Sequence, residues 1–264
     1  MKTLSFALSL ATILTSMGCS NASTNSRSEA QPEDEIVEKV EVNDTLLHKS
    51  QVSVDGIEFN KLIADPHNSY VTMVDSVIPN INDSTIALCV EAAFTGELLK
   101  EFKSTNVGGD YVIDGVKHRG YKCKANTGFL VTFNGHPTIS SLDNLKDHLE
   151  TKETLFQQLL LINGGADVYT GKPIKPSSEN IYRAACIMSD GGFTIIQSVK
   201  KISLQQFIDS LIKLGVNDAL YLDMGKGWNY GWYRETMGSP ATKFFDFKSP
   251  YQTNWLVIKA RDIK

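Results

Sequence analysis

Four short stretches of the chain place a turn dipeptide between runs rich in apolar residues, and this pattern limits the fold more than any other. Asp-Gly and Asn-Gly are typical of type I′ turns, because both central residues of such a turn need a positive φ angle. Strands joined in this way pair antiparallel, so we expect a substantial antiparallel sheet. The four stretches are VSVDGIEF, YVIDGVKHRGY, FLVTFNGHPTI and ACIMSDGGFTII.

Helical signals are fewer than strand signals. Ser203 and Gln206 have the spacing of a capping box, and the apolar residues that follow recur on one helical face as far as Gly215, which can end the helix. A second helix is expected over 141–149, and the run 155–162 fits either a helix or a buried strand. The chain is therefore predicted to be an α+β single domain, in which a large mixed or antiparallel sheet is packed by a few helices.

The first residues resemble a bacterial lipoprotein signal peptide. A lysine at position 2, an apolar run and small residues precede Cys19, the residue that would carry the lipid. The next segment is rich in Ser, Asn, Asp and Glu, and such a segment buries too little surface to fold. Ordinary cleavage near Cys19 is the alternative to lipidation. We expect a signal peptide over 1–18, a disordered tether over 19–48 and a folded domain over 49–264.

The composition excludes several classes of protein. With 42% hydrophobic and 21% charged residues, the chain is an ordinary globular protein. A formal net charge of −4 and the lack of a basic stripe argue against nucleic acid as a partner. Histidines and cysteines lack the spacing of a metal site, so neither metal nor cofactor is predicted, with a divalent cation beside Asp223 as an open alternative. Buried free thiols are expected, or else a single disulfide, among Cys89, Cys123 and Cys186.

The stretch ALYLDMGKGWNYGWYR, residues 219–234, places one carboxylate at the end of an apolar strand. Asp223 would leave the sheet where a glycine-rich loop begins, and rigid structure holds such a group beside an adaptable backbone. Partial burial there adjusts the proton affinity of a carboxyl group. Asp223 is therefore the first candidate for an acid or base. A structural role, capping the loop or pairing with an arginine, is the alternative.

The order of several motifs resembles the phosphodiester glycosidase family. These motifs are RAA from Arg183, SDGG from Ser189, an apolar strand, a helix and the stretch LGVNDALYLDMGKG. The resemblance covers roughly residues 84–234. It implies a hydrolase that acts on a sugar-1-phosphate diester or a related glycoside, with a carbohydrate or sugar phosphate as its ligand.

The chemistry of that reaction selects the candidate site residues. Glycosides are commonly hydrolysed by two carboxyl groups, and phosphate is held by arginine or by backbone N–H groups of glycine-rich turns. Sugar rings present flat faces to aromatic side chains. The candidate catalytic residues are Asp223, Glu91 and Asp190, and the candidate substrate-binding residues are Arg183, Gly225, Lys226, Gly227, Asn126, Thr127, Trp228 and Tyr230.

Each of these candidates has a structural alternative. Asp190 and the pair Asn126–Thr127 precede glycines, where such residues simply favour turns. Strand alternation can place Glu91 on a solvated face and can turn the aromatic rings onto the core. For the whole chain, the alternative to an enzyme is a non-catalytic glycan-binding lipoprotein on the same scaffold. In either case we expect a lipid anchor in the outer membrane of the bacterial cell envelope, on the periplasmic side or at the surface.

Overall fold

The computed structural model describes residues 44–95, 107–151, 153–224, 230–246 and 254–261. They belong to one compact unit, Val42–Lys264. The predicted signal peptide, Cys19 and most of the predicted tether lie outside the described residues. Within the described part, no helix has both the length and the apolar character needed to cross a bilayer.

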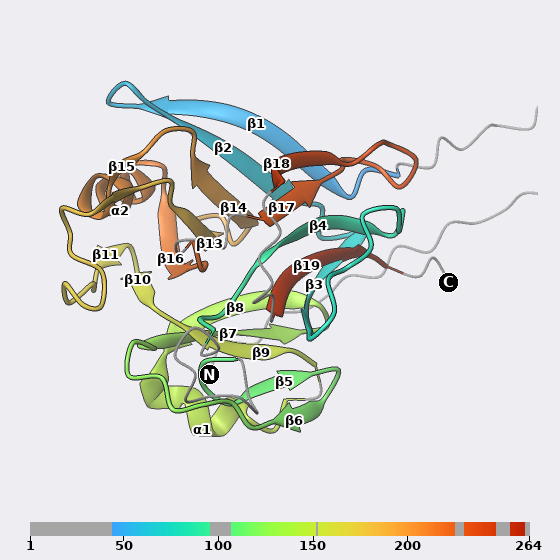
Figure 1. Cartoon of the computed structure of the whole chain (residues 1–264), viewed down its shortest axis with the longest axis horizontal. Coiled ribbons are helices and arrows are strands. Elements are labelled where there is room, and N and C mark those ends of the chain that lie inside the picture. The colour runs from blue at the N-terminus through green and yellow to red at the C-terminus, as the bar shows by residue number, and fades with distance from the viewer. Residues whose placement is uncertain (1–43, 96–106, 152, 225–229, 247–253, 262–264) are drawn as a thin grey trace, which may run out of the picture. The chain divides into compact units, whose positions relative to one another are not determined.

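Strands make up most of the described residues, and the few helices are short (Figure 1). The prediction of an α+β domain is therefore wrong, because the fold is nearly all-β. Apart from a two-stranded pair, the strands form three sheets. We call them sheets I, II and III. The two-stranded pair joins β12 (Glu179–Asn180) to β15 (Ile202–Ser203).

Sheet I has seven strands, and all of its paired neighbours are antiparallel. Its first hairpin has the predicted turn, since Asp55 and Gly56 have φ angles of 51° and 78°. The SDGG hairpin differs, because it pairs Ile187 with Phe193 across a longer turn in which Gly191 has a positive φ. In order across the sheet, the strands are β1 (Leu47–Val54), β2 (Ile57–Ala64), β14 (Phe193–Ser198), β13 (Arg183–Met188), β16 (Val216–Tyr221), β10 (Leu160–Asn163) and β11 (Ala166–Asp167).

Sheets II and III have five strands each. Two hairpins of sheet III contain the remaining predicted type I′ signals, with positive φ at Asp114–Gly115 and at Asn134–Gly135. In order, sheet II contains β18 (Thr242–Asp246), β17 (Tyr230–Tyr233), β4 (Ile86–Glu91), β19 (Asn254–Ala260) and β3 (Ser69–Asp75). Sheet III contains β6 (Val116–His118), β5 (Tyr111–Ile113), β9 (Leu155–Gln158), β7 (Gly128–Phe133) and β8 (His136–Ser141).

The ambiguous run 155–162 forms strands rather than a helix. Leu159 separates β9, which belongs to sheet III, from β10, which belongs to sheet I. The O atom of Leu159 accepts a hydrogen bond of 2.9 Å from the N–H of Tyr221, just where the chain changes sheet. This short segment therefore ties two sheets together.

The helices cover the outer faces of two sheets. Helix α2 (Leu204–Lys213) begins with the predicted capping box, in which the N–H of Gln206 donates to Ser203 Oγ over 3.2 Å. Its apolar face packs on one side of sheet I (Figure 1). The second predicted helix is only a 3₁₀ turn, η2 (Leu142–Asn144), followed by one α-helical turn, α1 (Leu145–His148), which covers sheet III.

One central core lies among the inner faces of the three sheets. It contains Ala185, Ile195 and Leu220 from sheet I, Leu88 and Leu256 from sheet II, and further side chains from sheet III. Because successive side chains of a strand point to opposite faces, the alternate residues Ala184 and Cys186 of β13 face α2 instead. The packing therefore follows the pleat of each strand.

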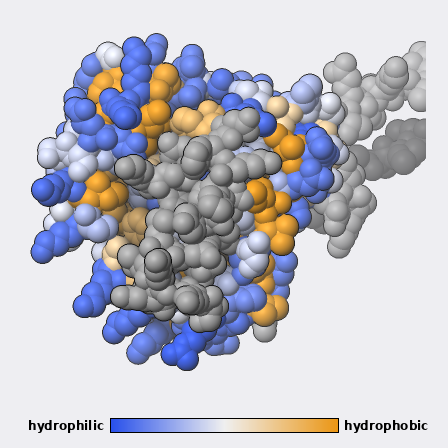
Figure 2. Space-filling model, viewed as in Figure 1, coloured by the Kyte–Doolittle hydropathy of each residue, from blue (hydrophilic) through white to orange (hydrophobic). Residues whose placement is uncertain are grey.

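The folded part begins slightly before the predicted boundary at residue 49. Leu46 and Leu47 are fully buried in the central core, and β1 begins at Leu47. At the described surface, hydrophilic side chains predominate on the face shown in Figure 2, with smaller hydrophobic areas between them.

Candidate functional site

Glu91 and Arg183 form a buried ion pair between sheets I and II. Glu91 is the last residue of β4 and Arg183 is the first of β13. Arg183 Nη1 lies 3.2 Å from Glu91 Oε2, and the two residues are 0% and 6% exposed. Arg183 lies two positions before Ala185 in the same strand, so the pleat directs its side chain to the central core and to sheet II.

The other nitrogens of the guanidinium are bound by Gln197 of β14. Arg183 Nε and Nη2 both donate to Gln197 Oε1, over 2.9 and 2.6 Å. The group also lies over the ring of Phe244, 5.5 Å from its centroid. A Cβ atom at Gly231 would come within 3.3 Å of Nη2, so glycine at this position leaves room for the guanidinium. Gln197, Glu91, Phe244 and Gly231 thus surround the guanidinium of Arg183.

Asp223 follows β16 by two residues and reaches the same place. It is 7% exposed, and its N–H donates to the O atom of Ala92, the residue after Glu91, over 3.1 Å. The N–H of the preceding Leu222 donates to Arg183 O over 3.0 Å. The structure therefore brings together Glu91, Arg183 and Asp223, three of the candidate residues selected from the sequence.

Ala92 and Ala93 are the point at which the three sheets are joined. Asn254 of sheet II accepts from the Ala93 N–H over 2.7 Å and donates to Ala93 O over 3.2 Å. Gln158 of sheet III donates to Ala92 O over 3.1 Å, the same oxygen that Asp223 binds from the sheet I side. Glu91 is consequently held by backbone that is fixed from three directions.

The two carboxyl groups influence each other. Burial raises the pKa of Glu91 from 4.5 to about 8, and the negative charge of Asp223 adds to this rise. Arg183 and the N–H of Tyr230, which donates to Glu91 Oε1, act in the opposite direction without cancelling it. Burial lowers the pKa of Arg183, while Glu91 opposes this effect. Burial therefore favours the protonated form of Glu91 beside a second carboxyl group.

Tyrosine rings border Asp223. Burial is the main reason why the pKa values of Tyr221 and Tyr121 are raised. The negative charge of Asp223 adds to the rise at both residues. Tyr121 also shares a hydrogen bond with Cys123. On the other side, the ring of Tyr221 lies 5.8 Å from the ring of Phe94, between centroids. Aromatic side chains therefore lie beside this carboxyl group within the described part.

Asn126 and Thr127 lie beside this aromatic border. Asn126 Nδ2 donates to Gly108 O over 2.7 Å, while its Oδ1 atom is buried and has no hydrogen-bond partner among the described residues. Thr127 Oγ1 accepts from the Leu160 N–H over 2.9 Å. Thr127 thus holds the first residue of β10 by a hydrogen bond, whereas the Oδ1 atom of Asn126 accepts none from the described residues.

The aromatic and glycine candidates after Asp223 are only partly described. The side chain of Tyr230 packs with Trp232 and Trp255 in a cluster on sheet II, so the described role of Tyr230 at Glu91 is that of its backbone N–H. Four further candidates lie outside the described residues, namely Gly225, Lys226, Gly227 and Trp228.

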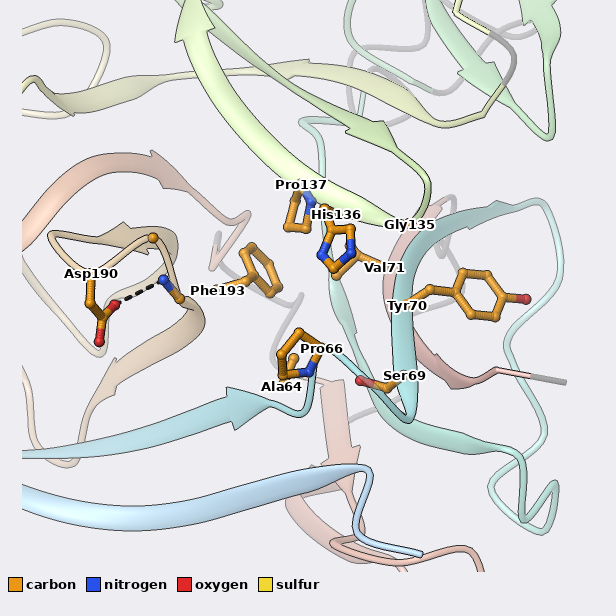
Figure 3. A pocket seen from close by; sticks show the side chains of 12 residues that line it. Ala64, Pro66, Ser69, Tyr70, Val71, Gly135, His136, Pro137, Asp190 and Phe193 are labelled. Carbon is orange, nitrogen blue, oxygen red and sulfur yellow. Dashed lines mark hydrogen bonds between the residues drawn. The ribbon is translucent and has the colours of Figure 1, made fainter. Parts of the chain in front are cut away.

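Asp190 lies apart from the other candidates. It is exposed in the turn at the opposite end of β13 from Arg183, and its Oδ1 atom accepts from the Gly192 N–H over 2.9 Å. The turn lines a cavity of about 360 Å³ together with Pro137 and Phe193 (Figure 3). This cavity includes neither Glu91 nor Asp223 in its lining. Asp190 is therefore not part of the buried cluster.

The described residues contain no group of three or more His, Cys, Asp or Glu side chains that could hold a metal ion. Cys89, Cys123 and Cys186 are free thiols, of which Cys89 and Cys186 are buried and Cys123 is half-buried. No disulfide joins these three cysteines.

Sequence reasoning missed Gln197, Gln158 and Asn254. A signal for Gln197 was present, because the hairpin formed by β13 and β14 pairs Arg183 directly with Gln197. A polar residue opposite a strand-opening arginine is a natural hydrogen-bond partner. Gln158 and Asn254 belong to other sheets, and no local pattern relates them to residue 91.

Comparisons with known proteins support the fold. No model of a known protein family matches the chain. No curated protein matches it by sequence. The structure is similar to the catalytic domain of zebrafish N-acetylglucosamine-1-phosphodiester alpha-N-acetylglucosaminidase, auto-inhibited by its pro-peptide, with a TM-score of 0.57 and 14% identity over 83% of this chain and 85% of that one.

A second similar structure is that of a hypothetical protein from Synechocystis, with a TM-score of 0.48 and 12% identity over 81% of this chain and 62% of that one. At such identities only the fold is shared. The chain therefore has a distant structural resemblance to the catalytic domain of a glycosidase.

Proposed function

We propose that the chain is a hydrolase that cleaves a glycosidic bond, with a sugar-1-phosphate diester or a related glycoside as its substrate. One observation carries this proposal. Glu91 and Asp223 come from distant parts of the chain, yet they share one buried site, and the pKa of Glu91 is raised to about 8. Glycosidases commonly cleave their substrate with a pair of carboxyl groups whose different environments give them different pKa values.

The two carboxyl groups take different roles in this scheme. Glu91 keeps its proton at neutral pH and donates it to the oxygen of the leaving group. Asp223 acts on the opposite side of the bond, as the base that activates water or as the nucleophile. Arg183 holds Glu91 in place through the hydrogen bond from Nη1, while Gln197 fixes the other side of the guanidinium.

The substrate would be held by residues at the aromatic border. Asn126 Oδ1 has no partner among the described residues and can accept a hydrogen bond from a sugar hydroxyl. A phosphate would be held by the backbone of Gly225 and Gly227 and by Lys226, as the family resemblance suggests. The resemblance of residues 1–19 to a lipoprotein signal peptide supports a place in the cell envelope, where a lipid on Cys19 would anchor the chain.

The test is turnover of sugar-1-phosphate diesters and aryl glycosides by the full chain and by two variants. Asp223→Asn should lower turnover by about 10²-fold or more while ligand affinity is retained, going by typical acid–base contributions. Asp190→Asn makes the same substitution at the far end of β13 and should leave turnover unchanged. A chain that binds these sugars without any turnover would be a glycan-binding protein, and the enzymatic proposal would be wrong.

A further inference from the structure

Gln197 occupies the side of the Arg183 guanidinium that would otherwise bind a carboxylate best. The edge formed by Nε and Nη2 can donate two parallel hydrogen bonds to the two oxygens of one carboxylate. In this structure both nitrogens donate to the single Oε1 atom of Gln197, over 2.9 and 2.6 Å. From the guanidinium, Glu91 receives a single hydrogen bond, donated by Nη1 over 3.2 Å.

The way in which the guanidinium nitrogens are divided between Gln197 and Glu91 affects the proton affinity of Glu91. A bidentate arginine bond stabilises the ionised form of a carboxyl group strongly, whereas a single longer bond stabilises it less. We propose that Gln197 is a positioning residue of this site, which diverts the two-nitrogen edge of Arg183 away from Glu91 and so keeps Glu91 protonated and able to act as an acid. This inference rests on the proposed function only in taking Glu91 as the acid.

Among the described residues, Arg183 is the cationic neighbour of Glu91. The charged or titratable groups that act on it or lie beside it are Arg183 of β13, Asp223 after β16 and Cys89 of its own strand. Strand β17 contributes the Tyr230 N–H, and β19 contributes the apolar Trp255, which pairs directly with Glu91. A change in how Arg183 divides its hydrogen bonds between Gln197 and Glu91 should therefore shift the pKa of Glu91.

Gln197 is itself well fixed. It is buried, and β14 pairs it with Arg183 on one side and with Asn60 on the other. Gly231 and Phe244 confine the guanidinium from sheet II. The hydrogen-bond acceptor is thus presented by two paired strands, which makes the division of Arg183 a property of the sheet rather than of a loop.

Two substitutions of Gln197 should shift the titration of Glu91 in opposite directions. Gln197→Leu removes the competing acceptor, so Arg183 can turn its edge to Glu91, which should then ionise at a lower pH. Gln197→Glu supplies a full carboxylate that takes the edge and neutralises Arg183, so Glu91 should ionise at a higher pH. Each shift should reach about tenfold in proton affinity, the effect of about 1.4 kcal/mol.

The measurement is the ¹³C titration of the glutamate carboxyl carbons in the full chain, with the Glu91 signal assigned by its loss in Glu91→Gln. Gln157→Leu is the matched control, because it removes a buried amide that donates to Asp110 O in another part of the fold, over 2.8 Å. That control should not move the Glu91 signal. Should Gln197→Leu fail to fold, Gln197→Glu is nearly isosteric and tests the same point.

An unchanged Glu91 midpoint in a folded Gln197 variant, or shifts of the same sign in both variants, would overturn the inference. No substrate enters this measurement. A lack of turnover would therefore refute the proposed function while the titration still decides the role of Gln197. Where turnover is found, the high-pH limb of its pH profile should move in the same direction as the Glu91 midpoint.

Discussion

Nη1 of Arg183 lies 3.2 Å from Oε2 of Glu91, and both residues are buried although 92 positions separate them in the chain. Their bond links the first residue of β13 in sheet I to the last residue of β4 in sheet II. Removing one partner of a buried pair leaves the other as an uncompensated charge, which is far more costly than removing both.

Above pH 8, where Glu91 is ionised, Arg183→Met should therefore lower the free energy of unfolding by about 3–5 kcal/mol. The double variant Arg183→Met with Glu91→Leu should recover part of this loss, because neither charge then remains buried alone. Urea unfolding of the wild type, both single variants and the double variant completes a double-mutant cycle, which gives the interaction free energy of the pair. Strictly additive losses would mean that the two side chains do not interact.

The stability of the chain should depend on pH through Glu91. Its pKa rises from 4.5 to about 8 on folding, so between these pH values the folded chain binds a proton that the unfolded chain has released. The contribution of Glu91 to stability is complete below the lower value and is lost as pH rises through the upper one. Its slope cannot exceed about 1.4 kcal/mol per pH unit.

Glu91→Gln should remove this slope, since glutamine does not titrate. Urea unfolding of both proteins at several pH values between these limits gives the difference directly. Parallel stability curves for the two proteins would show that Glu91 takes up no proton on folding.

Two turn glycines should differ in their tolerance of alanine. Gly56 and Gly135 have φ angles of 78° and 72°, so alanine is strained at both, by about 1–2 kcal/mol. An added Cβ meets nothing within 4 Å at Gly56, whereas at Gly135 it comes within 2.5 Å of Tyr70 Cβ. Thermal unfolding should therefore show a distinctly larger loss for Gly135→Ala, and equal losses would contradict the close packing of β3 against this turn.

The capping box of α2 should contribute measurably to stability. Ser203→Ala removes the acceptor of the Gln206 N–H, and loss of such a cap costs about 1 kcal/mol. Ser53→Ala, at an exposed serine of β1, is the control and should change stability by less than about 0.5 kcal/mol. Denaturant midpoints of the two variants provide the comparison.

Part of the fold could be predicted because it depends on neighbouring residues. The turns at 55–56, 114–115 and 134–135 follow from the φ angles that Asp-Gly and Asn-Gly accept, and the start of α2 follows from two side chains three positions apart. The strand exit before Asp223 likewise follows from one apolar run. Each of these features is decided by hydrogen bonds and sterics within a few positions of the chain.

The candidate site could be predicted in part, through the order of motifs that suggested Arg183 and Asp223 and through the need for a second carboxyl group, for which Glu91 was a candidate. Their meeting depends on how the faces of sheets I and II pack, and the pleat of β13 and β4 decides which side chains enter that interface. Asp190 shares the motif order yet lies at the other end of β13. Spacing along the sequence does not show which end of a strand lies at the site, so it could not separate Arg183 from Asp190.

By itself, the sequence determined the hairpin turns, the capped helix and the residues capable of acid–base chemistry, because these depend on local geometry and on side-chain type. Only the tertiary structure decided the nearly all-β class, the passage of residues 155–163 from sheet III to sheet I, and the sharing of Arg183 between Glu91 and Gln197. The physical reason is that hydrophobic burial is non-directional, so apolar runs alone do not specify which strands become neighbours.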